Sequence, residues 1–415
     1  MTLSHFILGM GTFEIARRQC QDVSLKEIIS FNEFKERENI IKENYPDLVN
    51  IKYLDDKLNN LYPNGDWMRI DKELYKIKPV DIMCSLTPCG QLSSLTKTKN
   101  TLLKGPNAEK NKWIYEAIKA YLASGSKYFV LENSDHLSRK KGSIIINNIK
   151  SIFKENNIQN IKIHMVRSNA LSYGLPQHRE RTILILYKKD YFFDIPFFNK
   201  KVKLIDFLNN LNVDNTNDPD NVIIKPYNIQ ENWLCFLNNN KALLEKYKKL
   251  YSNNNFSGIR INKFIKEFPY INDDAILEKV LNQIKTNTVA YNKSPLFPTD
   301  SIGAVIRKNL GRTINPITNN YFSIRELMCF MGYPTSFILP NPQKNHQLFY
   351  KAIPVNIAKF FIQFLCNENK KIIDFYETSD VLIQVNNHKT GKREFYNSNF
   401  KPLHVKEHFK LSFQE

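Results

Sequence analysis

The sequence predicts an α/β fold in which helices cover both faces of a mostly parallel sheet. The first observation is a set of short apolar runs, each expected to be a strand: 6–8, 27–31, 81–84, 128–131, 161–164 and 182–186. The second is that helix-like stretches separate them, of which 113–123 has clear helical spacing. The third is the amphipathic pattern of 354–365, which begins with Pro, a residue favoured at the start of a helix.

The pattern also indicates how the chain is divided. Residues 1–190 carry the strand and helix alternation, whereas 191–300 are rich in Asn, Lys and aromatic residues and predict a second, irregular domain. Regular patterning returns over 301–367. Residues 368–415 form a C-terminal extension, in which 380–397 predicts a β-hairpin around an Asn/His/Gly turn.

Length and charge limit the functions that the protein can have. A chain of 415 residues is long enough for two domains, and 42% hydrophobic with 24% charged residues is typical of a soluble globular protein. The net charge of +18 indicates a polyanionic partner, because phosphates bound by basic side chains release counterions. An AT-rich genome, which encodes much Lys, Asn and Ile, is the other explanation.

Composition argues against a disulfide-rich, metal-binding, secreted or membrane protein. The 6 Cys are widely spread and no Cys or His pair has zinc-site spacing, so we expect neither a disulfide framework nor a bound metal. The first positive charges, Arg17 and Arg18, follow the apolar N-terminal run, which is the wrong order for a signal peptide. No stretch is long enough to cross a membrane, so an intracellular location is expected.

Three polar clusters follow or precede predicted strands, at the sheet edge where open α/β proteins place their sites. These are 87–93 (TPCGQLS), 131–133 (LEN) and 177–181 (QHRER). They combine a thiol, a carboxyl group and two guanidinium groups. Such a set suits nucleophilic addition to an electron-poor aromatic ring, with an acid and cationic donors to relieve the developing charge.

Taken in order, these motifs resemble those of the cytosine-5 DNA methyltransferases, over roughly residues 4–190 and 300–362. The resemblance rests on Leu8–Phe13, Pro88–Cys89, Glu132–Asn133, Gln177–Arg181, Ser323–Phe337 and Ala352–Ala358. It implies a Rossmann-like S-adenosylmethionine-dependent methyltransferase sheet with a smaller irregular target-recognition domain. Residues 1–190 and 301–367 would then form the catalytic and cofactor-binding domain, and 191–300 the target-recognition domain.

The resemblance also implies a mechanism. Cys89 is expected to attack C6 of cytosine as a thiolate, on a base flipped out of the double helix. Glu132 is expected to contact N3 and the exocyclic amine, while Arg179 and Arg181 hold O2 and the Cys89 loop. The other expected site residues are Gly9, Gly11, Asn32, Asp55 and Asn356 for the cofactor, and Asn133, Gln177, Gln91 and Ser93 for the substrate.

The sequence departs from the family pattern mainly where the cofactor should bind. Gly90 stands where the family usually has Gln directly after the nucleophile. The acid expected at the cofactor ribose aligns near Asn32 and Glu33, cleanly on neither, and the acid at the adenine is Asp55 or its neighbour.

Three functions remain open. The first is a monomeric methyltransferase of double-stranded DNA, alone or with a cognate restriction endonuclease as partner. The second is an RNA (tRNA) cytosine-5 methyltransferase, which the long recognition segment disfavours. The third is an inactive DNA-binding homologue, which the intact set Cys89, Glu132, Arg179 and Arg181 disfavours and the cofactor-site departures favour.

Overall fold

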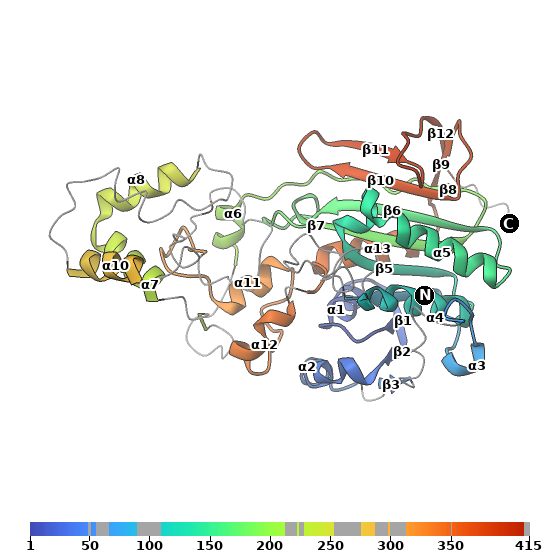
Figure 1. The fold of residues 1–415 in the computed structure, drawn as a ribbon, viewed down its shortest axis with the longest axis horizontal. Helices are drawn as coiled ribbons and strands as arrows, with labels where there is room; N and C mark the ends of the chain where they lie inside the picture. Colours follow the sequence, from blue (N-terminus) through green and yellow to red (C-terminus); the bar gives the residue numbers. More distant parts are fainter. Residues whose placement is uncertain are drawn as a thin grey trace. The chain divides into compact units, whose positions relative to one another are not determined.

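The computed structural model describes residues 1–48, 51–54, 66–88, 109–211, 222–223, 228–252, 275–286, 298, 313–349 and 351–410 (Figure 1). The chain forms two compact units. The first unit comprises Met1–Gly174, Glu180–Lys201 and Lys351–Glu415, and the second unit comprises Leu175–Arg179 and Val202–Tyr350.

The described part of the first unit contains a nine-stranded sheet of order β11-β10-β6-β7-β5-β4-β1-β2-β3. Its strands are β1 Thr2–Phe6, β2 Ser24–Ser30, β3 Ile51–Tyr53, β4 Ile82–Leu86, β5 Tyr128–Ser134, β6 Ile161–Asn169, β7 Glu180–Lys188, β10 Val381–Asn387 and β11 Lys392–Tyr396. Neighbours pair in parallel, except that β7 is antiparallel to β5 and β6, and β11 to β10. The predicted mostly parallel α/β sheet is therefore confirmed.

The central strands are the most apolar runs of the sequence. Every residue of β4 and β5 is buried, as expected for strands covered on both faces. The strand expected at 6–8 is displaced, because β1 runs from Thr2 to Phe6 and Ile7 ends it with φ 68. That left-handed conformation is incompatible with an extended strand.

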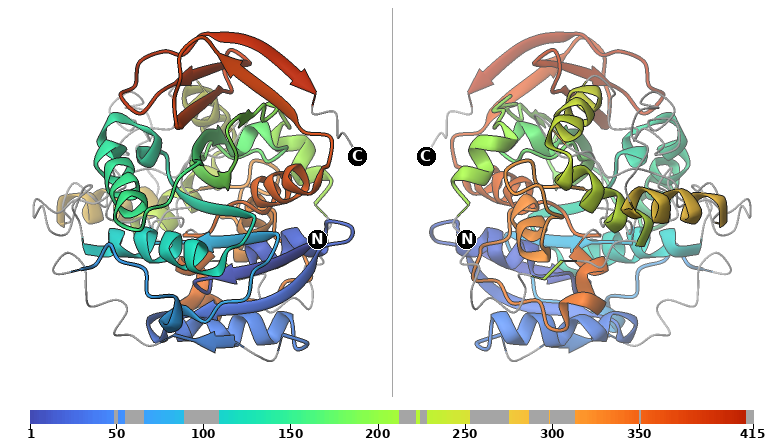
Figure 2. Two further views of the ribbon diagram at one scale, coloured as in Figure 1. Left: turned by 90° about the vertical axis from the view of Figure 1, so that its right-hand side faces the viewer. Right: turned by 90° about the vertical axis from the view of Figure 1, so that its left-hand side faces the viewer.

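Helices of the first unit pack in two groups. α1 (Thr12–Arg18) packs against α13 (Val355–Cys366), and α4 (Lys112–Ser124) packs against α3 (Lys72–Tyr75) and α5 (Ser143–Glu155). Figure 2 shows these groups on either side of the sheet, with β10 and β11 at one end and β2 and β3 at the other. The remaining helical elements are η1 Asn32–Arg37, α2 Glu38–Asn44, η3 Glu109–Asn111, η4 Asp135–Ser138, η5 Lys140–Gly142 and η6 Ala170–Ser172.

The C-terminal extension completes the large sheet. β10 pairs in parallel with β6, and the β10–β11 hairpin turns at Gly391, which has φ 73. A second sheet of order β12-β9-β8 joins β8 (Phe192–Phe193), β9 (Lys371–Phe375) and β12 (Val405–Lys410) in antiparallel pairs. The extension is thus built into the first unit.

The described elements of the second unit are helical. They are α6 Leu204–Asn209, α7 Asn228–Asn239, α8 Lys241–Ser252, α10 Ala275–Thr286, α11 Ile324–Phe330 and α12 Pro342–Phe349. Trp233, Phe236, Tyr247 and Val280 are fully buried in one apolar cluster. The assignment of 191–300 to target recognition stays a prediction. Among the described residues, no helix is both long and apolar enough to cross a membrane.

Candidate active site

The carboxyl ends of β4 and β5 bring two of the predicted motifs together. Leu86, the last residue of β4, pairs with Glu132 in β5. On the other side of β5, Ser134 pairs with Arg181 near the start of β7. The backbone ladders therefore fix Glu132 and Arg181 at one edge of the sheet, next to the point where the chain leaves β4 towards Cys89.

Glu132 and Arg181 form an ion pair at this edge. Arg181 Nε lies 2.8 Å from Glu132 Oε1, and the carboxyl side chain is 0% exposed while the arginine is 15% exposed. Arg181 Nη1 also donates a hydrogen bond to the Glu180 carbonyl at 2.7 Å. A buried carboxylate is costly without such a partner, so the pair holds an acid and a cation in fixed positions. Together they can donate hydrogen bonds to, and accept hydrogen bonds from, the polar edge of a planar ring.

Asn133 connects this edge to the segment that leads to Cys89. Its Nδ2 donates to Thr87 Oγ1 at 3.0 Å, and its Oδ1 accepts from the Ser134 N–H at 2.8 Å. Both Asn133 and Thr87 are buried. The structure therefore gives Asn133 a positioning role, and its expected contact with substrate stays a prediction. Four expected site residues lie outside the described part of the chain: Cys89, Gln91, Ser93 and Asp55.

Gln177 and Arg179 belong to the second unit, where they are joined to another predicted motif. Gln177 Nε2 donates to the Phe330 carbonyl at 2.9 Å, at the end of α11. The Arg179 N–H donates to the Gln177 carbonyl at 3.0 Å, and both side chains are buried. α11 itself begins with a capping box between Ser323 and Glu326. The substrate contacts expected of Gln177 and Arg179 stay predictions.

The Gly-rich turn after β1 has an unusual backbone. Ile7 has φ 68 and Gly11 has φ 75, and a β-branched residue in this region is strained. The Leu8 N–H donates to Ser30 Oγ at 3.0 Å, and Arg37 Nη1 donates to the Leu8 carbonyl at 2.6 Å. The turn is therefore fixed from β2 and η1, and Gly11, without a Cβ, adopts its left-handed conformation without strain.

Asn32 and Asn356 are the other expected cofactor residues that the structure describes. Asn32 is exposed and begins η1 directly after β2, beside the strand whose Ser30 holds the Gly-rich turn. Asn356 lies in the first turn of α13, where its Nδ2 donates to the Tyr173 carbonyl at 2.9 Å. The cofactor contacts of both residues stay predictions.

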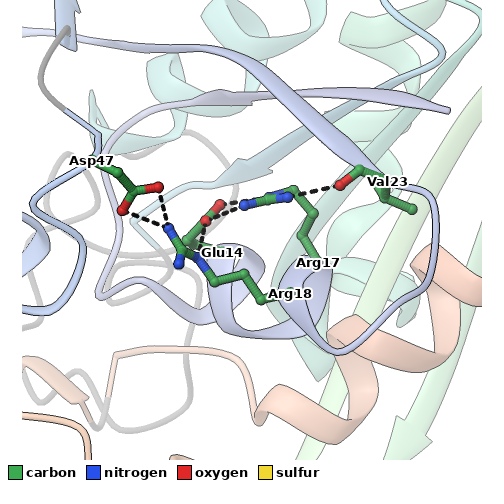
Figure 3. A network of polar contacts seen from close by, with 5 residues as sticks. All are labelled: Glu14, Arg17, Arg18, Val23 and Asp47. Atoms are coloured by element: carbon green, nitrogen blue, oxygen red, sulfur yellow. Dashed lines mark hydrogen bonds and ion pairs between the residues drawn. The ribbon is translucent and has the colours of Figure 1, made fainter.

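A polar network anchors α1, the helix that follows the turn (Figure 3). Glu14, whose side chain is buried, forms ion pairs with Arg17 and Arg18, the latter at 2.6 Å. Arg18 also pairs with Asp47 at 2.7 Å, and Arg17 donates to the Val23 carbonyl at 2.7 Å. Burial alone would raise the pKa of Glu14, but the hydrogen bonds from Arg17 and Arg18 bring it below its usual value.

The sequence analysis did not single out three residues that hold the two parts of the proposed site. Ser30 and Arg37 fix the Gly-rich turn, and Thr87 accepts the bond from Asn133. The available signal was position alone, since Ser30 lies in the strand predicted at 27–31 and Thr87 opens the polar cluster 87–93. A Ser or Thr at the end of a strand is too common to mark a site without the pairing register.

The chain is similar to a known family in sequence and to known proteins in structure. The family model for C-5 cytosine-specific DNA methylases matches residues 25–366. A prophage-encoded E. coli protein designated a DNA modification methyltransferase is similar in structure, with a TM-score of 0.51 and 16% identity over 88% of this chain and 97% of the other. The Entamoeba histolytica methyltransferase EhMeth has a TM-score of 0.50 and 11% identity over 88% and 97%. At such identities the likeness shows the fold. No curated protein matches in sequence.

Proposed function

Because the chain belongs to the C-5 cytosine-specific DNA methylase family, we propose that it methylates C5 of cytosine in double-stranded DNA through a covalent adduct with Cys89. The family transfers a methyl group to cytosine and uses S-adenosylmethionine as the donor. The observation that carries the proposal is the buried Glu132–Arg181 ion pair at the edge where β4 leads into the Cys89 segment.

The residues of this edge suit addition to cytosine. The Cys89 thiolate forms a bond to C6, and electrons move from the C5–C6 double bond towards N3 and O2. Glu132 hydrogen-bonds N3 and the exocyclic amine, while Arg179 and Arg181 stabilise the charge on O2. C5 thereby becomes nucleophilic. Once C5 is methylated, loss of its proton to a base and breakage of the sulfur–carbon bond release the product. The base must leave the stacked helix for this to happen.

The Gly-rich turn fits the cofactor. S-adenosylmethionine, when bound, supplies the methyl group. Gly11 at φ 75 allows the backbone to approach a ligand closely, and the strained Ile7 is the kind of outlier that functional turns retain. Gly9, Gly11 and Asn32 are proposed to hold it, together with Asp55 and Asn356. The bonds from Ser30 and Arg37 to Leu8 support this assignment, because they fix the turn before any ligand arrives.

The test is transfer of label from S-adenosylmethionine to nucleic acid. Wild-type protein is incubated with labelled donor and either mixed-sequence duplex DNA or tRNA, and 5-methylcytosine is measured. We expect label in DNA, and none with Cys89→Ala. Cys235→Ala removes an exposed cysteine of the second unit and serves as the matched control with unchanged turnover. Label in tRNA alone would assign the RNA reaction instead, and full turnover by Cys89→Ala would contradict the mechanism.

A further inference from the structure

A hollow of about 380 Å³ lies in the first unit, away from the residues assigned above to cytosine. Its lining residues come from four segments, which are the C-cap of α1 (Gln19), the end of η6 with the residue that follows it (Ser172, Tyr173), the segment after β8 (Phe198, Lys200) and α13 between residues 356 and 363. Its volume falls within the range of small-molecule sites, which is about 300–1,000 Å³.

Aromatic rings form one wall. Phe360 packs edge-on against Tyr173 at 5.2 Å between ring centroids, and against Phe198 at 6.1 Å. Phe198 is 62% exposed, which is unusual for so large an apolar side chain. The exposed Phe198 ring, supported by Phe360, offers a flat surface on which a nucleobase can stack.

The hollow also carries positive charge. Lys200 and Lys359 line it, and none of the described residues that line it is Asp or Glu. Lys200 is exposed and Lys359 is half-buried. Two ammonium groups beside an aromatic wall suit a ligand that combines a phosphate with an aromatic ring.

A buried hydroxyl points independently to a ligand. Ser172 lines the hollow and is only 2% exposed, yet its Oγ has no hydrogen-bond partner among the described residues. Buried hydroxyls usually have a partner, since an unmade hydrogen bond costs about 1–3 kcal/mol. Asn356 also lines the hollow, and its Nδ2 donates to the Tyr173 carbonyl at 2.9 Å.

The hollow is distinct from the Gly-rich turn. Its lining includes Gln19, the C-cap of α1, whereas Gly11 is the N-cap of the same helix. Seven helical residues separate these two ends by about 10 Å. Of the described residues assigned above to the cofactor, only Asn356 lines the hollow, and residues 7–11 and 30–32 contribute nothing to its lining.

We propose that this hollow binds a nucleotide other than the target cytosine, with the base stacked on Phe198, which Phe360 supports edge-on, and the phosphate near Lys200 and Lys359. The nucleotide is either free in solution or one unit of a nucleic-acid strand. Binding of a nucleotide within a nucleic-acid strand rests on the proposed function, whereas binding of a free nucleotide does not.

The test measures dissociation constants by calorimetry on the full-length protein, with S-adenosylmethionine saturating so that its own site is filled. The probes are adenosine monophosphate and a single-stranded pentanucleotide without cytosine, which cannot serve as methyl acceptor. Phe198→Ala is expected to weaken binding about tenfold, because stacking on one ring typically contributes this much. Lys200→Gln combined with Lys359→Gln should weaken it further and flatten its salt dependence.

Tyr376→Ala is the matched control, since Tyr376 is 71% exposed and does not line the hollow. Binding of the mononucleotide identifies a free ligand, and binding of the pentanucleotide alone identifies a strand. The proposal is overturned if neither probe binds, if S-adenosylmethionine displaces the probe, or if Tyr376→Ala weakens binding as much as Phe198→Ala. Probe binding by a protein that methylates no nucleic acid would contradict the proposed function and leave this site standing.

Discussion

The two halves of the proposed site are held in different ways. At the β4–β5–β7 edge, side chains at defined ladder positions carry the chemistry, and the Glu132–Arg181 pair is fixed by the backbone on both sides. At the β1–β2 edge, the backbone conformation defines the site. Ile7 and Gly11 are left-handed, and α1, the helix that follows them, is anchored by the Glu14 ion pairs. Substitutions at the first edge should therefore change turnover, and those at the second should change stability and cofactor affinity.

Among substitutions in the described part of the chain, Glu132→Gln is expected to have the largest effect, because it removes the charge at the site and keeps the volume of the side chain. Turnover should fall about 10²–10⁴-fold, as is typical when an acid or base is lost. The affinity for S-adenosylmethionine should change little, since the Gly-rich turn is untouched. Steady-state methylation and equilibrium cofactor binding separate the two. Glu155→Gln, on the exposed end of α5, should leave both unchanged. A parallel loss of cofactor affinity in Glu132→Gln would break the distinction between the halves.

This distinction also explains what the sequence could predict. The apolar runs of β4, β5 and β7 and the polar residues at their ends predicted the sheet and brought Glu132 and Arg181 to one edge. The antiparallel position of β7 between β5 and β6 was not predictable, because apolar pattern does not encode strand order. Nor was the pairing of β10 with β6, which joins residues more than two hundred positions apart.

The β1–β2 half was predicted less well for a physical reason. Its features are backbone angles, and glycine is the residue type from which a left-handed angle can be predicted in a sequence. Ile7 adopts one despite its branched side chain, so the expected strand was misplaced by several residues. Ser30 and Arg37 act through bonds to the Leu8 backbone, which no residue pattern reveals.

Glu14→Gln tests the anchor of the second half. The substitution removes the buried charge that Arg17 and Arg18 share and leaves them, among the described residues, the Val23 carbonyl and the exposed Asp47 as hydrogen-bond partners. The free energy of unfolding should therefore fall, by at most the roughly 3–5 kcal/mol typical of a broken buried ion pair. Asp47→Asn is the matched control at the exposed end of the same network, where an ion pair contributes about 0–1 kcal/mol. Urea unfolding measures both. Equal effects of the two substitutions would mean that the network is a surface feature rather than an anchor.

Acid should lower the free energy of unfolding through two buried histidines, His5 in β1 and His164 in β6. Burial lowers the pKa of His5 from 6.5 to about 4 and that of His164 from 6.5 to about 3. The unfolded chain then binds more protons than the folded one between pH 6.5 and 4, so stability falls as pH falls through this window. Each histidine contributes a slope of about 1.4 kcal/mol per pH unit there.

His5→Gln should therefore remove about half of the slope that the two histidines produce, and the comparison is made by urea unfolding at pH 6.5, 5.5 and 4.5. His404 is exposed, and its substitution, His404→Gln, is the control. An unchanged slope in His5→Gln would show that His5 is protonated in the folded protein.

Gly11→Ala is expected to have the smallest effect and to sharpen the comparison most. At φ 75 an alanine costs about 1–2 kcal/mol, so the Gly-rich turn should lose stability or shift. Gly125→Ala is the control with a matching backbone angle, because Gly125 has φ 70 at the C-cap of α4 and its Cβ would meet nothing within 4 Å.

Both variants should lose similar stability, but only Gly11→Ala should weaken S-adenosylmethionine binding, by about tenfold if the shift costs 1.4 kcal/mol. Its turnover with saturating donor should stay close to wild type, because Glu132 and Arg181 are held by strands that the substitution does not reach. Weaker cofactor binding in both variants would mean that affinity follows overall stability. A turnover loss confined to Gly11→Ala at saturating donor would mean that the turn also orients the methyl group, and the two halves would then act as one.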